Sequence, residues 1–212
     1  MEDMEETLGN EPIYEGEWIG DFLIDGDILV RYKGDAENVA VPVGVARIGK
    51  EAFAKNERIC SVTLPEGVIE IEKDAFYECS NLKAVVWPQS LRYIGSAAFN
   101  GTGLTSLCLP DGVAKIGEMA FGRCGQLVSV VLPEGLRVMD QLVFANCRRL
   151  QSITIPQRVE RIKMYACRFC PLTRVIYKGT MAQWQALRAV LTGFVDMSGY
   201  IYCVDGTIQG IY

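Results

Sequence analysis

Cysteines are the residues with the clearest chemical potential in this 212-residue chain, which has eight of them and no histidine. Cys167 and Cys170 form a C-x-x-C pair, a spacing that can serve a redox centre or supply half of a zinc site. The lack of histidine removes Ser-His and Cys-His catalysis and every histidine-metal arrangement. The sequence contains no second C-x-x-C and no glycine-rich phosphate loop. It therefore offers no complete catalytic or metal-binding motif.

A repeat positions these cysteines and runs through most of the chain. Its prolines are separated by steps of 23, 23, 22, 23 and 23 residues: Pro42, Pro65, Pro88, Pro110, Pro133 and Pro156. Three apolar columns keep the same step, starting from Val45, Ile48 and Phe53. A fixed period of this size predicts a solenoid, because one unit cannot bury its own apolar face whereas stacked units can.

Each repeat unit predicts a short strand followed by a turn. In the unit Val62–Phe76, the alternation of Val62, Thr63 and Leu64 predicts a strand with one buried face. Proline then ends the strand, and we expect a type I turn with proline second and Gly67 fourth. The chain returns through the Val-x-x-Ile pair and turns at Ala-Phe. Because connections between parallel strands are right-handed, we expect a right-handed superhelix with its prolines in a line.

Four of the cysteines share one position of the repeat, eight residues after the isoleucine column. That position holds Asn56, Cys79, Thr102, Cys124, Cys147 and Cys170. Asparagine and threonine replace cysteine there, which favours a small inward side chain in a tight turn over a row of metal-binding or redox thiols. Cys167 takes the place that phenylalanine holds in earlier repeats. We therefore expect a structural role for the C-x-x-C pair, with a thiol switch or a metal as alternatives.

The pattern LxxVxLPxxVxxIgxxAFxxC resembles the BspA-type leucine-rich repeat found in many bacterial surface and secreted proteins. The resemblance covers residues 38–178, and the segments YKGTMAQWQAL and YCVDGTI are similar to the closing module that often follows such repeats. It implies a leucine-rich-repeat solenoid with a parallel sheet on one wall and short strands, turns or helical turns on the other. It implies no particular site, because the family is united by its scaffold.

Segments at both ends fall outside the repeat and predict caps over the exposed apolar edges. At the front, residues 18–37 contain two strand-like runs around Asp25-Gly26, which predict a hairpin. Residues 1–17 precede this cap and are expected to form a loose tail. The tail carries seven acidic side chains: Glu2, Asp3, Glu5, Glu6, Glu11, Glu15 and Glu17.

The second cap comprises residues 179–212 and combines a helix with a hairpin. Thr180 is placed to cap a helix that ends before Gly193. Its apolar face holds Trp184, Leu187 and Leu191. The hairpin is predicted around Asp205-Gly206.

The strands predict one outward-facing wall, which we call the sheet wall, and its outward positions can be read from the repeat. One outward column is Thr63, Val86, Cys108, Val131, Thr154 and Ile176, and it is the predicted partner-binding site. The neighbouring column is Ser61, Ala84, Ser106, Ser129, Ser152 and Arg174. This surface has small side chains and no charge before Arg174, which suits close approach of a protein or an extended peptide. The alternative is that the β-branched residues serve strand propensity alone.

Composition narrows the function further. The chain is 50% hydrophobic and 22% charged, which is typical of a folded protein, and its formal net charge of −5 argues against binding nucleic acid. The first ten residues are acidic and lack the apolar core of a signal peptide. No run of about 18 apolar residues occurs, so we expect no membrane insertion. These features predict a cytoplasmic protein, with secretion or surface display as the alternative if a signal segment is missing.

We therefore expect a protein-interaction scaffold that is not an enzyme and needs no cofactor. Its partner is expected to be a protein or peptide bound on the sheet wall. A homodimer through the same wall is an alternative, since a two-fold dimer uses one patch on both copies. The second function class, which follows from the resemblance, is a structural or adhesive module of a bacterial cell surface.

Overall fold

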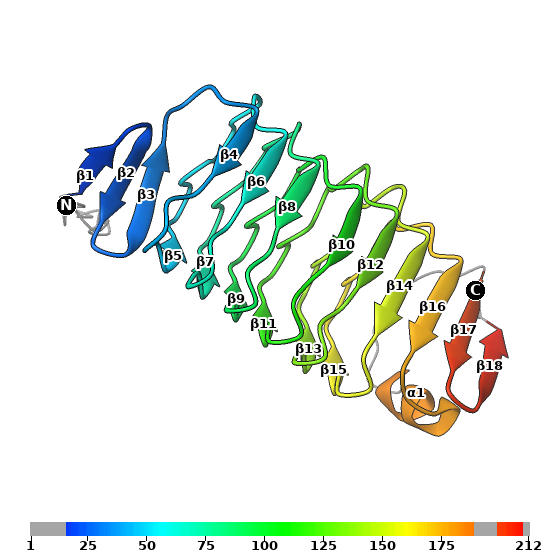
Figure 1. Cartoon of the computed structure of the whole chain (residues 1–212). Helices are drawn as coiled ribbons and strands as arrows, with labels where there is room; N and C mark the ends of the chain where they lie inside the picture. The colour runs from blue at the N-terminus through cyan, green and yellow to red at the C-terminus, as the bar shows by residue number, and fades with distance from the viewer. Residues whose placement is uncertain (1–15, 189–198, 210–212) are drawn as a thin grey trace, which may run out of the picture.

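A computed structural model describes residues 16–188 and 199–209 of the chain. The described residues form one elongated solenoid with a cap at each end (Figure 1). A single hydrophobic cluster runs through it from Leu29 in the first cap to Ile201 in the second. The predicted leucine-rich-repeat solenoid with a parallel sheet is confirmed.

Six turns of the solenoid contribute one strand to each of two walls, and a seventh contributes a strand to the first wall alone. The sheet wall contains β4 (Asn38–Ala40), β6 (Ser61–Thr63), β8 (Ala84–Val86), β10 (Ser106–Cys108), β12 (Ser129–Val131), β14 (Ser152–Ile155) and β16 (Arg174–Tyr177). The second wall contains β5 (Arg47–Ile48), β7 (Glu70–Ile71), β9 (Tyr93–Ile94), β11 (Lys115–Ile116), β13 (Val138–Met139) and β15 (Arg161–Ile162). Neighbouring strands within the walls pair in parallel except between β8 and β10 and between β11 and β13, where the hydrogen-bonded sheets divide. In the paired strands, equivalent repeat positions lie opposite one another, as Val62 does to Val85.

Turns with left-handed residues build the third side of the solenoid. Two positions in every repeat adopt a positive φ between 52° and 74°: Glu51, Asp74, Ala97, Met119, Leu142 and Tyr165, and then Lys55, Glu78, Gly101, Arg123, Asn146 and Phe169. Only one of these residues is glycine, so residue type alone does not predict which positions are left-handed. The backbone is held by hydrogen bonds between turns. The N–H groups of Glu51, Phe53 and Lys55 donate to the next turn's carbonyls over 3.2, 2.8 and 2.7 Å.

The phenylalanine column forms a stack inside the third side. Ring centroids from Phe53 to Phe144 are separated successively by 4.7, 4.9, 5.3 and 5.8 Å, and neighbouring rings are within 14° of parallel. All five rings are buried. Trp87, which takes the place of a leucine at the end of a strand, packs its edge against Phe99 at 5.3 Å. The phenylalanines and Trp87 therefore point inward.

The proline turns differ from the prediction by one residue. Leu64, just after β6, donates its N–H to the carbonyl of Val86 on the next turn, as the predicted strand end requires. The turn then closes when the Val68 N–H donates to the carbonyl of Pro65, at 3.3 Å. Proline is therefore first and Gly67 third, with a φ of +105°. A positive φ at the third position is type II geometry, and the predicted type I assignment was wrong for this turn.

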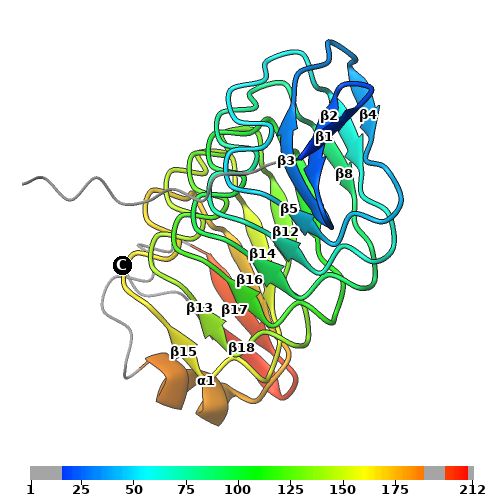
Figure 2. The ribbon, with the colours of Figure 1, turned by 90° about the vertical axis from the view of Figure 1, so that its left-hand side faces the viewer.

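The two caps continue the solenoid with strands of their own (Figure 2). At the front, β2 (Phe22–Asp25) and β3 (Ile28–Tyr32) form the predicted hairpin, and β1 (Glu17–Ile19) adds a third strand that starts inside the predicted tail. At the back, α1 (Met181–Arg188) begins after Thr180, whose hydroxyl accepts the Gln183 N–H at 3.2 Å. The hairpin of β17 (Tyr200–Cys203) and β18 (Gly206–Gln209) follows. Leu191 and Gly193 lie outside the described residues.

The phenylalanine stack should dominate local stability. We predict that Phe99→Ala costs about 3–5 kcal/mol of unfolding free energy, the usual loss for a buried aromatic, because Phe76 and Phe121 can fill the space only in part. Phe169→Ala is the control, since the Phe169 side chain is 63% exposed and should lose little. Urea unfolding of the three proteins measures the difference. A loss below about 1 kcal/mol at Phe99 would contradict the observed packing.

Candidate functional site

The predicted partner-binding column lies on the outer face of the sheet wall. Strand pairing places Thr63 beside Val86, and it aligns Cys108, Val131, Thr154 and Ile176 on successive strands. Val86 is 58% exposed and Val131 39% exposed, and Thr63 and Cys108 are also exposed. Thr154 and Ile176 are half-buried. The structure therefore shows the predicted outward register, while binding by this column stays a prediction.

A shorter repeat divides this column into two parts. Phe99 and Phe121 are 22 residues apart, and the missing residue falls in the turn around Gly103, where other repeats have a longer loop. A Cβ atom at Gly103 would lie 2.5 Å from the carbonyl oxygen of Ser80, so only glycine allows this tight passage. Among the described residues, β4, β6 and β8 form one hydrogen-bonded sheet and β10 begins another. The column therefore changes sheets between Val86 and Cys108.

The surroundings of the column are small and uncharged. Ala84 and Ser106 are exposed beside it, and Ser129 is half-buried. The Ser61 hydroxyl donates to the Asn38 side-chain oxygen at 2.6 Å, which ties together the first two strands of the wall. Short side chains leave little to obstruct the approach of another backbone. This part of the wall can therefore accept a flat or extended surface.

An aromatic patch at the far end of the wall was missed by the sequence reasoning. β17 pairs in parallel with β16, which places Tyr200 opposite Arg174 and Tyr202 opposite Ile176. Tyr200 is 49% exposed and Tyr202 39% exposed, and the Arg174 guanidinium lies 5.2 Å from the Tyr202 ring centre. The alternation of Tyr200, buried Ile201 and Tyr202 was the available signal. It was interpreted only as a cap hairpin, although this hairpin extends the wall.

The inward cysteines satisfy backbone groups between turns. Cys79, Cys124, Cys147 and Cys170 each donate a thiol hydrogen bond to the phenylalanine carbonyl of the preceding turn, over 3.0, 3.1, 3.1 and 3.0 Å respectively. All four are buried, and Thr102 occupies the same position with a hydrogen bond of 3.2 Å to Cys124. Burial raises the pKa of the Cys79 thiol to about 12. The geometry supports the structural interpretation of this column.

The C-x-x-C pair lies in the same buried layer. Cys167 is fully buried in the phenylalanine position, and the Cys170 N–H donates to its carbonyl at 3.2 Å. Both residues are free thiols. In the described part of the chain, no group of three or more cysteine, aspartate or glutamate side chains is arranged to hold a metal ion. The pair therefore resembles the rest of the inward column in its packing.

The chain belongs to the BspA type leucine rich repeat family. The family model matches in six copies over residues 31–99 and 70–186, which together cover more than half of the chain. This agrees with the resemblance seen in the repeat pattern. The family defines a scaffold of stacked repeats, in line with the two walls and the inward columns described above. A comparison with curated proteins finds no match.

Several solved bacterial structures share the fold. A leucine rich cell surface protein from Faecalibacterium prausnitzii is 28% identical over 80% of this chain, with a TM-score of 0.57. The pneumococcal vaccine antigen PcpA is 20% identical over 83% of the chain, with a TM-score of 0.70. A leucine-rich repeat protein from Eubacterium ventriosum is 21% identical over 88%, with a TM-score of 0.64. This chain covers 41%, 45% and 52% of those proteins, respectively.

The described residues include no helix with the length and apolar character needed to cross a membrane.

Thiol accessibility should follow the strand register. We predict that Cys108 reacts first with an alkylating reagent, because it is exposed on the sheet wall, whereas Cys79, Cys124, Cys147 and Cys170 are buried and should react slowly. Timed alkylation of the folded protein followed by peptide mass mapping gives the order. Labelling of Cys124 or Cys147 before Cys108 would show that the register is wrong.

Stability should fall with alkaline pH through Cys79. The folded state keeps the Cys79 proton up to its pKa of about 12, whereas the unfolded thiol loses it near the ordinary cysteine pKa of 9.0. The Cys79 pKa difference therefore makes its full contribution to the free energy of unfolding below about pH 9. This contribution is lost as the pH rises toward 12. We predict that Cys79→Thr weakens this pH dependence, because Thr102 shows that threonine fits the column. Cys108→Thr, at an exposed thiol, is the control, and equal slopes in both variants would contradict the assignment.

Proposed function

We propose that the protein is an interaction module that binds a partner protein or peptide on its sheet wall. The observation that carries this proposal is the exposed, uncharged column of Val86, Cys108 and Val131 on a flat wall of short side chains. Interface centres are depleted of charged residues, and exposed apolar strips on a folded protein often mark interaction sites. Solenoids commonly use such extended walls for binding.

The aromatic patch at the end of the wall also supports the sheet wall as the binding face. Tyrosine and arginine are the residues most enriched among energetically dominant interface positions, together with tryptophan. Tyr200, Tyr202 and Arg174 lie on the outward side of the same wall as Ile176, so one extended partner could contact the column and the patch together. Arg174 also provides the first charge on the wall, which would orient a partner along its length.

The proposed module has no catalytic role. The chain contains no histidine, and the buried cysteines donate to backbone carbonyls of neighbouring turns. Membership of a family united by its repeat scaffold agrees with a binding role. Turnover of a defined small molecule by the purified chain would overturn this part of the proposal.

Display on a bacterial cell surface is the second candidate function. It is favoured by the similarity to the F. prausnitzii protein, which is described as a leucine rich cell surface protein. Mild proteolysis of intact native cells tests this candidate: loss of the protein from unbroken cells is expected for surface display. Survival of the protein until the cells are lysed would place it inside.

The sheet wall can be tested by adding charge at exposed sites. We predict that Val86→Lys combined with Val131→Lys leaves folding intact, because both side chains already reach solvent, and reduces partner binding at least about tenfold, since each lysine must be desolvated in an interface. Affinity capture from the native cell lysate measures binding to a partner. Sedimentation equilibrium of the purified protein measures self-association, the alternative use of the wall.

A matched control places the same charge on the other wall. Ile69→Lys combined with Tyr93→Lys changes two exposed apolar residues, one just before β7 and one in β9 of the second wall, at 44% and 47% exposure. This variant should retain every partner that the wild-type protein captures. If both double variants bind like the wild type, the sheet wall is not the binding site.

A further inference from the structure

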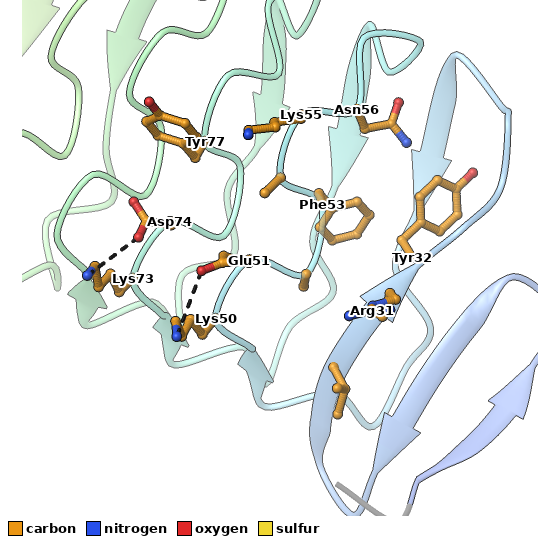
Figure 3. A pocket seen from close by; sticks show the side chains of 13 residues that line it. Arg31, Tyr32, Lys50, Glu51, Phe53, Lys55, Asn56, Lys73, Asp74 and Tyr77 are labelled. Carbon is orange, nitrogen blue, oxygen red and sulfur yellow. Dashed lines mark ion pairs between the residues drawn. The ribbon is translucent and has the colours of Figure 1, made fainter. Parts of the chain in front are cut away.

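A depression of about 1100 Å³ lies between the first cap and the third side of the solenoid (Figure 3). Three segments line it: residues 30–32 of β3, residues 50–56 of the first turn, and part of the second turn. It lies away from the proposed partner-binding column, since none of its lining residues belongs to the sheet wall. Any binding there would be a separate property of the molecule.

The depression exists because the cap covers the third side only in part. Along the solenoid, three N–H groups of one turn donate to three carbonyls of the next. In the first turn, the backbone N–H of Tyr32 reaches the Ala52 carbonyl at 2.9 Å. The next residue, Lys33, instead donates to Asp21 inside the cap. The cap strand therefore follows the first turn through its pairing with β5 and the Tyr32 bond, and then leaves it. The space beside residues 50–56 is open as a result.

Positive charge gathers around this opening. Four basic residues line it: Arg31, Lys50, Lys55 and Lys73. The two acidic lining residues, Glu51 and Asp74, are each near a lysine, at 3.8 Å from Lys50 and 3.7 Å from Lys73. Within the part of the chain that the structure describes, neither Arg31 nor Lys55 forms an ion pair. An excess of positive charge is unusual for a chain with a net charge of −5, and it favours an anionic occupant.

The first fifteen residues of the chain have the matching charge. They contain six carboxylates, at Glu2, Asp3, Glu5, Glu6, Glu11 and Glu15, and no lysine or arginine. The described chain begins at Gly16, next to Ile24 of β2, and β2 pairs with β3, the strand that lines the depression. Neighbouring strands are about 5 Å apart, and fifteen residues can extend about 50 Å. The segment is therefore long enough to reach the basic side chains.

We propose that the acidic segment of residues 1–15 binds the depression through carboxylate contacts with Arg31 and Lys55, supported by Lys50 and Lys73. The contacts are at the surface, so they should be weak singly, additive in number and sensitive to salt. Binding within the same chain makes the segment a local competitor for any acidic peptide that approaches this end of the solenoid.

The test uses the full-length protein and a glutamate-specific protease. At low salt, cleavage within residues 1–15 should be roughly two- to tenfold faster in the double variant Arg31→Gln with Lys55→Gln than in the wild type, because two charge contacts are lost. At about 1 M salt, where the screening length is about 3 Å, the two rates should converge. Circular dichroism must show equal folding of both proteins.

A matched control removes two exposed lysines outside the depression. Lys83→Gln combined with Lys115→Gln makes the same change in net charge and should leave the low-salt cleavage rate at the wild-type value. Equal rates for the wild type and the Arg31 and Lys55 variant would overturn the proposal, as would equal acceleration in the control. A labelled acidic peptide that binds the depression of the full-length protein should displace residues 1–15 and speed their cleavage. Binding of the peptide with no change in the cleavage rate, compared with the protein alone, would also overturn the proposal.

Discussion

Hydrogen bonding between successive turns of the third side is the constraint on which the rest of this structure depends. Left-handed residues at two positions of each turn allow its N–H groups to reach the carbonyls of the next turn. A non-glycine residue in this conformation costs about 1–2 kcal/mol. The bonds between turns offset that cost, and the phenylalanine rings are stacked at 4.7–5.8 Å by the same spacing. The same separation between successive turns thus suits both the backbone hydrogen bonds and the stacked rings.

The same constraint explains why the sequence predicted which residues point inward better than it predicted the backbone conformation. Buried columns repeat with the period, so Phe53, Cys79 and Ile71 could be assigned from spacing alone. The left-handed positions carry glutamate, lysine, leucine and other ordinary residues, because pairing between turns selects their conformation. The proline turn was displaced by one residue for a similar reason. The Gly67 N–H donates to the Ser90 hydroxyl of the next turn and the Val68 N–H closes the turn on Pro65, and a single repeat does not reveal the bond to Ser90.

The outward surface was predictable in register but not in extent. Alternation along β8, β10 and β12 placed Val86, Cys108 and Val131 on the outside, and their exposure agrees. The repeat period alone could not place the aromatic patch on the wall, because β17 lies 26 residues after β16 instead of 23 and Tyr200 falls outside the repeat frame. Pairing in space, through a cap that extends the wall, brings Tyr200 and Tyr202 beside Arg174. A candidate site that crosses from repeats into a cap is invisible to periodicity.

Both candidate surfaces arise where the regular stacking is interrupted. The turn around Gly103 is one residue short, and the hydrogen-bonded sheet of the wall divides there, between Val86 and Cys108. The depression forms where the first turn meets a cap strand that pairs with β5 and then makes one backbone hydrogen bond, from Tyr32 to Ala52, to residues 50–56. Within the regular repeats, stacking against the neighbouring turns restricts which side chains fit at the inward positions. Where the stacking is interrupted, this restriction on side-chain type is weaker. In a scaffold without catalytic groups, such breaks are where one repeat protein of this family can differ from another in what it binds.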